Sequence, residues 1–524
     1  MFTLAIAAIT ALLIFALFVR ATLFSSLQVR KMRWRTRMRL RPGPGFASHW
    51  EITIRWGFLA ALYHGKRYRP DMSLWQRLIR PVTDYSIRLG RTQGFRRIFA
   101  RGEDMVGIIA PQRTNKSGIL ADQIWSHPGA VVSVTTRADI FRNTVAKRAQ
   151  LGPVDVFNPE GVGGVPSTFR VDIISECVDP DIALRTAAAL VGPSEDAGDM
   201  SFWLSKAVNA LAALLHAAAL LGRDVDSVLL WASRMATHEV RTAATLPAAV
   251  PQLLAHAAEL DRDSKSSDSV RMTLNRSLAW VSVPCLRDMV AGEDLRLFDA
   301  AEWVRSRGTV YFIASGEGST SEPLFRAVVE KLYRDCVHAG SLTPYGRLPV
   351  PPLFALDEVT QTCSVPLNLW LATAAGSGCS IRFVVHTPAQ LVARYGKPTA
   401  DAIWALAGTK VILGGNSDIE LAQAISDLCG HYGDEKSEKV VPVAYLRQLP
   451  ESRALVISGP RSPIAVKVRP VWRRMVHRKS LRPLMTATGL LPVYHPAIAP
   501  EPVVQIPEPV SVPEIEPALE ESAA

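Results

Sequence analysis

The chain has 524 residues, of which 48% are hydrophobic and 20% are charged. This composition excludes a chain that is disordered throughout, because it supplies a large apolar core, and the length predicts two or three domains at roughly 100–200 residues each. The net charge of +11 favours anionic partners such as nucleic acid or lipid headgroups.

The first segment, Phe2 to Val19, is apolar and uncharged. It is long enough to cross a bilayer, at the short end of the range of about 17–25 residues. Arg20 and a basic cluster ending at Arg41 follow, so the positive-inside rule places the N-terminus outside and the rest in the cytoplasm. We therefore predict a single-pass anchor in the cell membrane over residues 1–24. A cleaved signal peptide is the alternative, but the segment lacks a basic n-region and a clean small-residue cleavage site.

Residues 25–100 are predicted to form a basic juxtamembrane region. Its arginines are expected at anionic headgroups, and a DNA-binding arm is the alternative interpretation. A linker rich in proline and glycine runs from Arg41 to Ser48. The apolar stretch from Ile54 to Tyr63 is too short to span a membrane and predicts a surface or interfacial helix.

From Met105 onwards, short apolar runs alternate with helical patterns. Continuous apolar runs are typical of strands that are buried on both faces of a parallel sheet. A doubly wound α/β nucleotide-binding domain is therefore predicted over residues 101–177 and 307–475. Its expected strands are 105–110, 130–135, 153–159, 309–315, 352–358, 381–386, 409–415 and 454–459, with a helix over 321–339.

Residues 178–306 are predicted as an all-helical insertion. Lys206, Asn209 and His216 interrupt its most apolar run, Ser201–Gly222, which favours a buried core helix over a second membrane span. The tail, residues 496–524, is rich in proline and glutamate and lacks basic residues, so we expect it to be disordered. A docking segment for a basic partner is the alternative. The six cysteines show no CxxC spacing and fit reduced cytosolic thiols.

A degenerate phosphate-binding loop follows the strand 105–110. A Walker A loop reads GxxxxGK[ST], and here both glycines are replaced, by Ala110 and Asn115, while Lys116 and Ser117 keep the frame. Asparagine also visits positive φ, so it can keep the loop geometry. An unspecialised basic helix start is the alternative. The predicted nucleotide-binding residues are Ala110, Pro111, Gln112, Arg113, Thr114, Asn115, Lys116, Ser117 and Gly118.

A second acidic element supports this assignment. The apolar run from Leu353 ends in Asp357 and Glu358. In P-loop motors the first carboxylate orients the Mg²⁺ shell and the second polarises the attacking water. Because both elements occur in the expected order on separate strands, the sequence predicts a fold that binds ATP and Mg²⁺.

The chain resembles the coupling-protein ATPases of type IV secretion and conjugation, the TraG/TraD group, and in particular an actinobacterial branch. The similarity covers roughly residues 40–430. It is carried by APQRTNKSG (110–118), HPGAVVSVTTRADIF (127–141), GPVDVFNPEGVGGVPSTFR (152–170), DMSFW (199–203), GTVYFIASGEG (308–318), LFALDEV (353–359), HTPAQL (386–391) and TKVILGG (409–415). The resemblance implies a membrane-anchored, RecA-like P-loop motor with an all-helical subdomain, usually working as a homo-hexamer. It also implies that the motor delivers relaxase-bound single-stranded DNA to a secretion channel.

The resemblance also implies a role for each site residue. Lys116 would bind phosphates, Ser117 and Asp357 would hold Mg²⁺, and Glu358 would be the catalytic base. His386 stands where many members have a glutamine that senses the γ-phosphate.

One further feature bears on activity. In the segment where the family carries its arginine finger, Arg382 is the only arginine. It stands beyond the expected place and is a weak candidate for the finger. Together with Asn115 and His386, this makes a nucleotide-binding scaffold that does not hydrolyse ATP an alternative. A translocase of the FtsK/HerA kind or a type VII secretion ATPase is disfavoured, because the chain lacks a C-terminal winged helix and repeated ATPase modules.

Overall fold

A computed structural model describes residues 43–473, except 93–95, 112–113, 115, 194–198, 235–237, 262–264, 317–318, 416–417, 434–437 and 451. The predicted membrane anchor, the basic cluster up to Arg41 and the acidic tail lie outside the described residues. The same holds for Gln112, Arg113 and Asn115 of the predicted phosphate loop.

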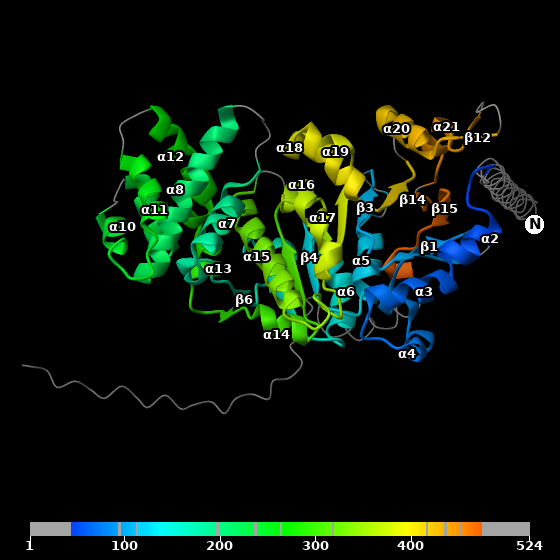
Figure 1. Ribbon diagram of the computed structural model, residues 1–524, viewed down its shortest axis with the longest axis horizontal. Coiled ribbons are helices and arrows are strands. Elements are labelled where there is room, and N and C mark those ends of the chain that lie inside the picture. The colour runs from blue at the N-terminus through cyan, green and yellow to red at the C-terminus, as the bar shows by residue number, and fades with distance from the viewer. Residues whose placement is uncertain are drawn as a thin grey trace, which may run out of the picture.

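An eleven-stranded sheet forms the centre of the described molecule (Figure 1). Seven neighbouring strands are parallel. In spatial order they are β11 (Thr409–Leu413), β3 (Val106–Ile109), β10 (Ser380–Val385), β9 (Leu353–Leu356), β4 (Val131–Thr135), β8 (Thr309–Ile313) and β5 (Val154–Phe157). Six of the seven are buried along their whole length, and Lys410 of β11 is the half-buried exception. This burial explains their continuous apolar sequences.

Four antiparallel strands extend the sheet beyond β11. They are β14 (Arg453–Ser458), β15 (Ile464–Lys467), β1 (Ser86–Arg91) and β2 (Arg97–Arg101). Residues 86–91 and 97–101 are therefore part of the sheet, although the sequence places them in the juxtamembrane region. A search for continuous apolar runs does not predict these strands, because β1 alternates buried Ile87 and Leu89 with arginines that are less buried. Such alternation is typical of strands near a sheet edge.

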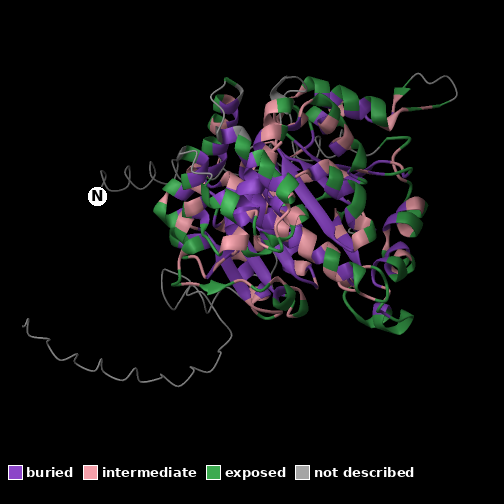
Figure 2. Cartoon of the chain, turned by 60° about the vertical axis from the view of Figure 1, so that its left-hand side comes forward, coloured by how far each residue is buried: buried purple, intermediate pink, exposed green. Residues whose placement is uncertain are grey.

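Helices cover both faces of the sheet, as expected for a doubly wound fold (Figure 2). Helices α5 (Lys116–Ser126) and α6 (Asp139–Arg148) share one core with Ile108. Helices α15 (Glu322–Ser341) and α17 (Leu367–Ser377) share the other core with Ile109. Neighbouring residues of β3 thus enter opposite layers, as the alternation of side chains along a strand requires.

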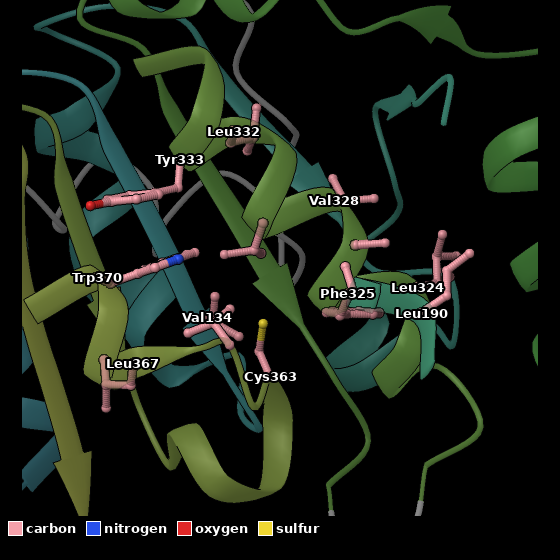
Figure 3. Packing of buried hydrophobic residues seen from close by; sticks show 14 of the residues in the cluster. Val134, Leu190, Leu324, Phe325, Val328, Leu332, Tyr333, Cys363, Leu367 and Trp370 are labelled. Atoms are coloured by element: carbon pink, nitrogen blue, oxygen red, sulfur yellow. The ribbon is translucent and has the colours of Figure 1, made fainter. Parts of the chain in front are cut away.

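The second layer is held together by aromatic packing (Figure 3). Tyr333 of α15 stacks on Trp370 of α17, with ring centroids 4.1 Å apart and planes 12° from parallel. Phe354 of β9 meets both rings edge-on. These contacts fix α15 and α17 against the strand that ends in the acidic pair.

The chain is helical between two short paired strands, β6 (Phe169–Arg170) and β7 (Arg296–Leu297). The helices are α7 (Pro180–Val191), α8 (Asp199–Leu221), α9 (Val225–Arg234), α10 (His238–Ala243), α11 (Pro251–Leu254), α12 (Lys265–Leu278) and α13 (Pro284–Ala291). Among the described residues, only Phe202–Leu221 of α8 is long and apolar enough to span a membrane. Its His216 bonds to the Cys177 carbonyl at 2.8 Å and to the Val250 amide at 3.2 Å, and α8 forms the core of this helical region.

Short helices complete the fold around the sheet. At the end of the molecule opposite the helical region lie α2 (His49–Glu51), a π-helical turn (Ile52–Trp56), α3 (Phe58–Tyr68) and α4 (Leu74–Ile79) (Figure 1). The segment predicted as a surface helix is therefore helical, with Tyr63 exposed and Trp56 buried. The remaining elements are α14 (Ala300–Arg305), α16 (Val359–Thr362), α18 (Pro388–Tyr395), α19 (Lys397–Leu406), α20 (Ile419–Cys429), α21 (Val443–Arg447) and the hairpin β12 (His431–Tyr432) and β13 (Glu438–Lys439).

Candidate nucleotide site

The strand order brings the predicted site residues to one edge of the sheet. Strand β10 lies between β3 and β9, and all three run parallel. Their carboxyl ends therefore meet at the same edge, where ligands of open α/β sheets bind. The residues that follow these ends are the phosphate loop after β3, His386 after β10, and Asp357 and Glu358 after β9.

Lys116 begins α5 and lies between two partners from neighbouring strands. Its ammonium group forms an ion pair with Glu358 Oε1 and lies 3.1 Å from His386 Nε2. All three side chains are largely buried, so the attraction between them is only weakly screened by solvent. A phosphate group that enters the site can replace Glu358 as the anionic partner of Lys116.

His386 is oriented by its second ring nitrogen. Nδ1 lies 3.1 Å from the carbonyl oxygen of Ala110 at the start of the phosphate loop. Because a carbonyl oxygen only accepts hydrogen bonds, Nδ1 carries the proton, and in the neutral ring Nε2 accepts from Lys116. His386 Nε2 can donate to a phosphate in this orientation only when the imidazole is doubly protonated.

Glu358 has a backbone conformation that is rare for a residue with a side chain. Its φ of 53° is in the left-handed region, which among the described non-glycine residues is shared only with Arg307. Such strain is characteristic of functional sites. Thr136 Oγ1 donates to Glu358 Oε2 at 3.1 Å. Burial alone would raise the pKa of Glu358. The hydrogen bond and charge of Lys116, together with Thr136 and His386, outweigh burial and lower this pKa overall. The carboxylate of Glu358 is therefore ionised.

Asp357 is buried beside Glu358. Ser117 Oγ donates to its Oδ2 at 3.2 Å, whereas its Oδ1 is buried without a hydrogen-bond partner in the described structure. Burial raises the pKa of Asp357 to about 6, against the opposing charge of Lys116. A buried carboxylate with an unused oxygen next to a serine hydroxyl is suited to Mg²⁺ and its water shell.

Ser117 and Asp357 can supply protein groups to a Mg²⁺ ion. Mg²⁺ commonly binds through one or two protein groups, with phosphates and water completing the shell. Ser117 Oγ and Asp357 Oδ2 lie 3.2 Å apart and are two such groups. Among the described residues, no group of three or more His, Cys, Asp or Glu residues could hold a metal.

The described remainder of the phosphate loop is compact. Thr114 is buried and donates from Oγ1 to the carbonyl of Pro111 at 2.6 Å. Gly118, predicted to bind nucleotide, packs in the first turn of α5, where a Cβ atom would lie 2.4 Å from the ring of Trp472. Close packing against Trp472 accounts for this glycine.

Arg382, the weak candidate for an arginine finger, is buried in the sheet. It is 4% exposed in β10, in register with Val106 and Ala355 in the flanking strands. Burial lowers its pKa to about 10, and Tyr68 of α3 is the opposing influence. A side chain buried inside its own subunit does not reach a nucleotide on a neighbouring subunit.

Two features of the site are not predicted from the sequence. Thr136 holds Glu358, and its position directly after the strand predicted at 130–135 was a usable signal. A buried network also links Arg326 and Arg394 through Glu322 and Ser364, and Arg326 donates to the carbonyl of Leu190 in α7 at 3.0 Å. This network connects the helical region to α18, the helix that follows His386. No local sequence motif predicts it.

The family described as the TraM recognition site of TraD and TraG matches residues 351–441. This segment contains Asp357, Glu358 and His386. The chain resembles the TraG/TraD coupling proteins, as its sequence predicts. A comparison with curated protein sequences gives no significant match.

Solved coupling proteins share the fold of this chain. The unbound bacterial conjugative coupling protein TrwBdeltaN70 gives a TM-score of 0.56 at 17% identity, over 78% of this chain and 91% of that one. The plasmid coupling protein TrwB in complex with ADP and Mg²⁺ gives 0.54 at 18% identity, over 70% and 86%. The chain thus shares its α/β architecture and mostly parallel sheet with the TrwB structures.

Proposed function

We propose that this chain is a membrane-anchored coupling ATPase that uses ATP hydrolysis to transfer DNA, or a DNA–protein complex, to a conjugation or secretion channel. The observation that carries the proposal is the meeting of Lys116, Asp357 and Glu358 at the carboxyl edge of a sheet with the TrwB fold. The TraD/TraG segment at 351–441 favours this function over that of an FtsK/HerA-like translocase.

The mechanism follows from the contacts at this edge. Lys116 exchanges Glu358 for the β- and γ-phosphate oxygens when ATP binds, and the released carboxylate faces the γ-phosphate. Glu358 then accepts a hydrogen bond from the attacking water, while Thr136 holds its other oxygen. Ser117 and Asp357 would hold Mg²⁺, which neutralises phosphate charge when bound.

The proposal extends to position and partners. The predicted anchor would place the N-terminus outside and the ATPase region in the cytoplasm, and ring assembly as a homo-hexamer is expected from the resemblance. The net charge of +11 is suited to DNA. Residues 351–441 are the candidate docking segment for a relaxase or another protein of the secretion apparatus, because that family is described as a recognition site.

ATP turnover of the full chain in detergent or lipid discs tests the proposal. Wild type, Lys116→Ala and the matched surface variant Lys397→Ala should be compared with and without single-stranded and double-stranded DNA. Lys397 begins α19 and is exposed, so its loss should be neutral. We expect DNA-stimulated turnover that only Lys116→Ala abolishes. Equal rates for wild type and Lys116→Ala would refute the ATPase.

A nucleotide-binding scaffold is the second candidate function. The burial of Arg382 favours it, because an arginine finger contributes about 10³–10⁵ in rate and this residue does not supply one. Nucleotide binding that depends on Lys116, combined with turnover no faster than that of Glu358→Gln, would identify the scaffold.

A further inference from the structure

Exposed apolar side chains are concentrated at one end of the molecule. Nine of the 21 large hydrophobic side chains that are exposed among the described residues lie between Trp50 and Ile79, on α2, the π-helical turn, α3 and α4. Soluble proteins rarely leave such a concentration uncovered, and it commonly marks a protein or membrane contact. These helices lie at the end opposite the helical region (Figure 1).

Helix α4 presents its apolar side chains from a rigid base. Ser73 and Gln76 form a reciprocal capping box at its start. The buried Arg77 donates to the carbonyl of Leu62 in α3 at 2.7 Å, which ties the two helices together. A small core of Ala61, Met72, Tyr85 and Phe99 lies beneath them. The outer residues of α4 are not part of this core: Leu74, Trp75, Leu78 and Ile79 are 54%, 74%, 43% and 82% exposed.

The charge around these side chains is positive. Within residues 49–80 the only acidic residues are Glu51 and Asp71, and each forms an ion pair with an arginine. Tryptophan, tyrosine, lysine and arginine around an aliphatic centre are the composition of a surface that lies in the headgroup region of a bilayer. A negatively charged lipid surface therefore complements this end of the molecule.

A cationic cavity of about 380 Å³ begins where α4 ends. Its lining includes Arg69, Arg80, Arg88, Lys147 and Arg307, with Asp84 as its single acidic residue. Arg69 and Arg88 are held by ion pairs with Asp71 and Asp122. Arg80, Lys147 and Arg307 form no ion pair with any residue that the structure describes. Lys147 Nζ donates to Gln150 Oε1 at 3.4 Å, and Asp84 offsets part of the charge of Arg80 and Arg307. The lining keeps an excess of positive charge that can bind an anionic group, and Arg80 directly follows Ile79.

We infer that the exposed surface of α3 and α4 binds an anionic phospholipid bilayer, with the side chains of α4 among the acyl chains and a lipid phosphate in the adjacent cationic cavity. The inference rests on the proposed membrane attachment. The apolar segment Phe2–Val19 and the basic cluster up to Arg41 precede this surface in the chain. An anchor so close in sequence gives the surface a high effective concentration at the membrane, so that a weak contact suffices. Bilayer contact at two places would fix the orientation of the ATPase above the membrane.

The test uses the full chain in lipid discs that contain phosphatidylglycerol and brominated acyl chains. Of the described cysteines, Cys285 is exposed and Cys429 is half-buried, so a background with both replaced by serine permits labelling at one introduced cysteine. Ile79→Cys carries an environment-sensitive fluorophore. Met272→Cys on α12, 73% exposed in the helical region, is the matched control.

We expect the label at position 79 to shift to shorter wavelength and to be quenched by bromine, and the label at 272 to do neither. Arg80→Gln combined with Arg307→Gln should reduce the quenching to the level found in phosphatidylcholine discs. If the chain enters the discs and the label at 79 stays unquenched, the inference is wrong and the proposed function is untouched. A shift without quenching that depends on protein concentration would assign the surface to a second copy. A chain that does not enter the discs contradicts the anchor and, with it, this inference.

Discussion

Lys116, which is half-buried, and Arg148, which is buried, are cations on the same helical layer, but their neighbours hold them in different ways. Lys116 begins α5 and is held by Glu358 and His386, two titratable side chains. Arg148 ends α6 and donates to the carbonyls of His127 and Gly129 at 2.6 and 2.7 Å and to Thr309 Oγ1 at 2.6 Å. A carboxylate partner can be exchanged for a phosphate, whereas backbone carbonyls cannot leave. The first arrangement is a binding site, and the second is a structural junction.

The largest expected effect is the loss of the structural junction. Arg148→Met leaves several buried acceptors without a donor, and we expect a loss of about 3–4 kcal/mol in the free energy of unfolding. Denaturant unfolding measures it. Arg142→Met is the matched control on the same helix, because Arg142 makes one exposed bond to Gly163, and its effect should stay within about 0.5 kcal/mol. Equal losses of unfolding free energy in the two variants would contradict the structural role of Arg148.

Glu358→Gln, which changes the exchangeable partner of Lys116, should move turnover and nucleotide affinity in opposite directions. We expect turnover to fall about 10²–10³-fold because the water loses its base. Nucleotide affinity should rise about fivefold, since Lys116 is released from a competing carboxylate at roughly 1 kcal/mol. Single-turnover hydrolysis and titration with a non-hydrolysable analogue separate the two effects. An unchanged affinity would show that Glu358 does not compete with phosphate for Lys116.

Asp357 should destabilise the nucleotide-free protein at neutral pH. Its folded pKa of about 6 is above the value of about 3.9 expected when unfolded. Its contribution to stability is therefore fully present below about pH 4 and is lost as the pH rises through 6. Asp357→Asn should stabilise the protein at pH 8 by an amount on the order of 2 kcal/mol and leave it unchanged near pH 4. Thermal unfolding at the two pH values measures this difference.

The same carboxylate makes Mg²⁺ binding depend on pH. A protonated Asp357 does not hold the Mg²⁺ shell, so Mg²⁺-dependent nucleotide affinity should fall about tenfold for each pH unit below 6. Calorimetric titration between pH 5 and 8 tests the slope. In Asp357→Asn the slope should vanish. A wild-type slope that persists in this variant would assign the pH dependence to another group.

The sequence predicts the centre of this molecule better than its edges. The seven parallel strands and β14 were all found, because burial on both faces leaves continuous apolar runs. Strands β1, β2 and β15 were missed. The first two carry arginines among their apolar residues, and the pairing that attaches their hairpin to the sheet is made with β15, which is distant in sequence.

The candidate site divides in the same way. Lys116, Ser117, Asp357, Glu358 and His386 were identified because each follows a strand that the apolar pattern reveals. The left-handed backbone of Glu358, the Ala110 carbonyl that orients His386 and the Arg326 network depend on contacts between distant segments. The local sequence does not predict such contacts. The surroundings of Arg382 are not predictable for the same reason, because Tyr68 approaches it from a helix outside the predicted nucleotide-binding domain.

The smallest expected effect comes from His386, whose geometry the sequence alone does not give. Its Nδ1 proton is committed to Ala110, so the neutral ring offers no hydrogen bond to a γ-phosphate. His386→Gln supplies an amide donor, and we expect turnover to rise about two- to fivefold at pH 8, the equivalent of one ordinary hydrogen bond. His386→Ala supplies no donor at this position, so its turnover should not exceed that of the wild type. If His386→Gln is no faster than the wild type, the side chain at this position takes no part in sensing the γ-phosphate.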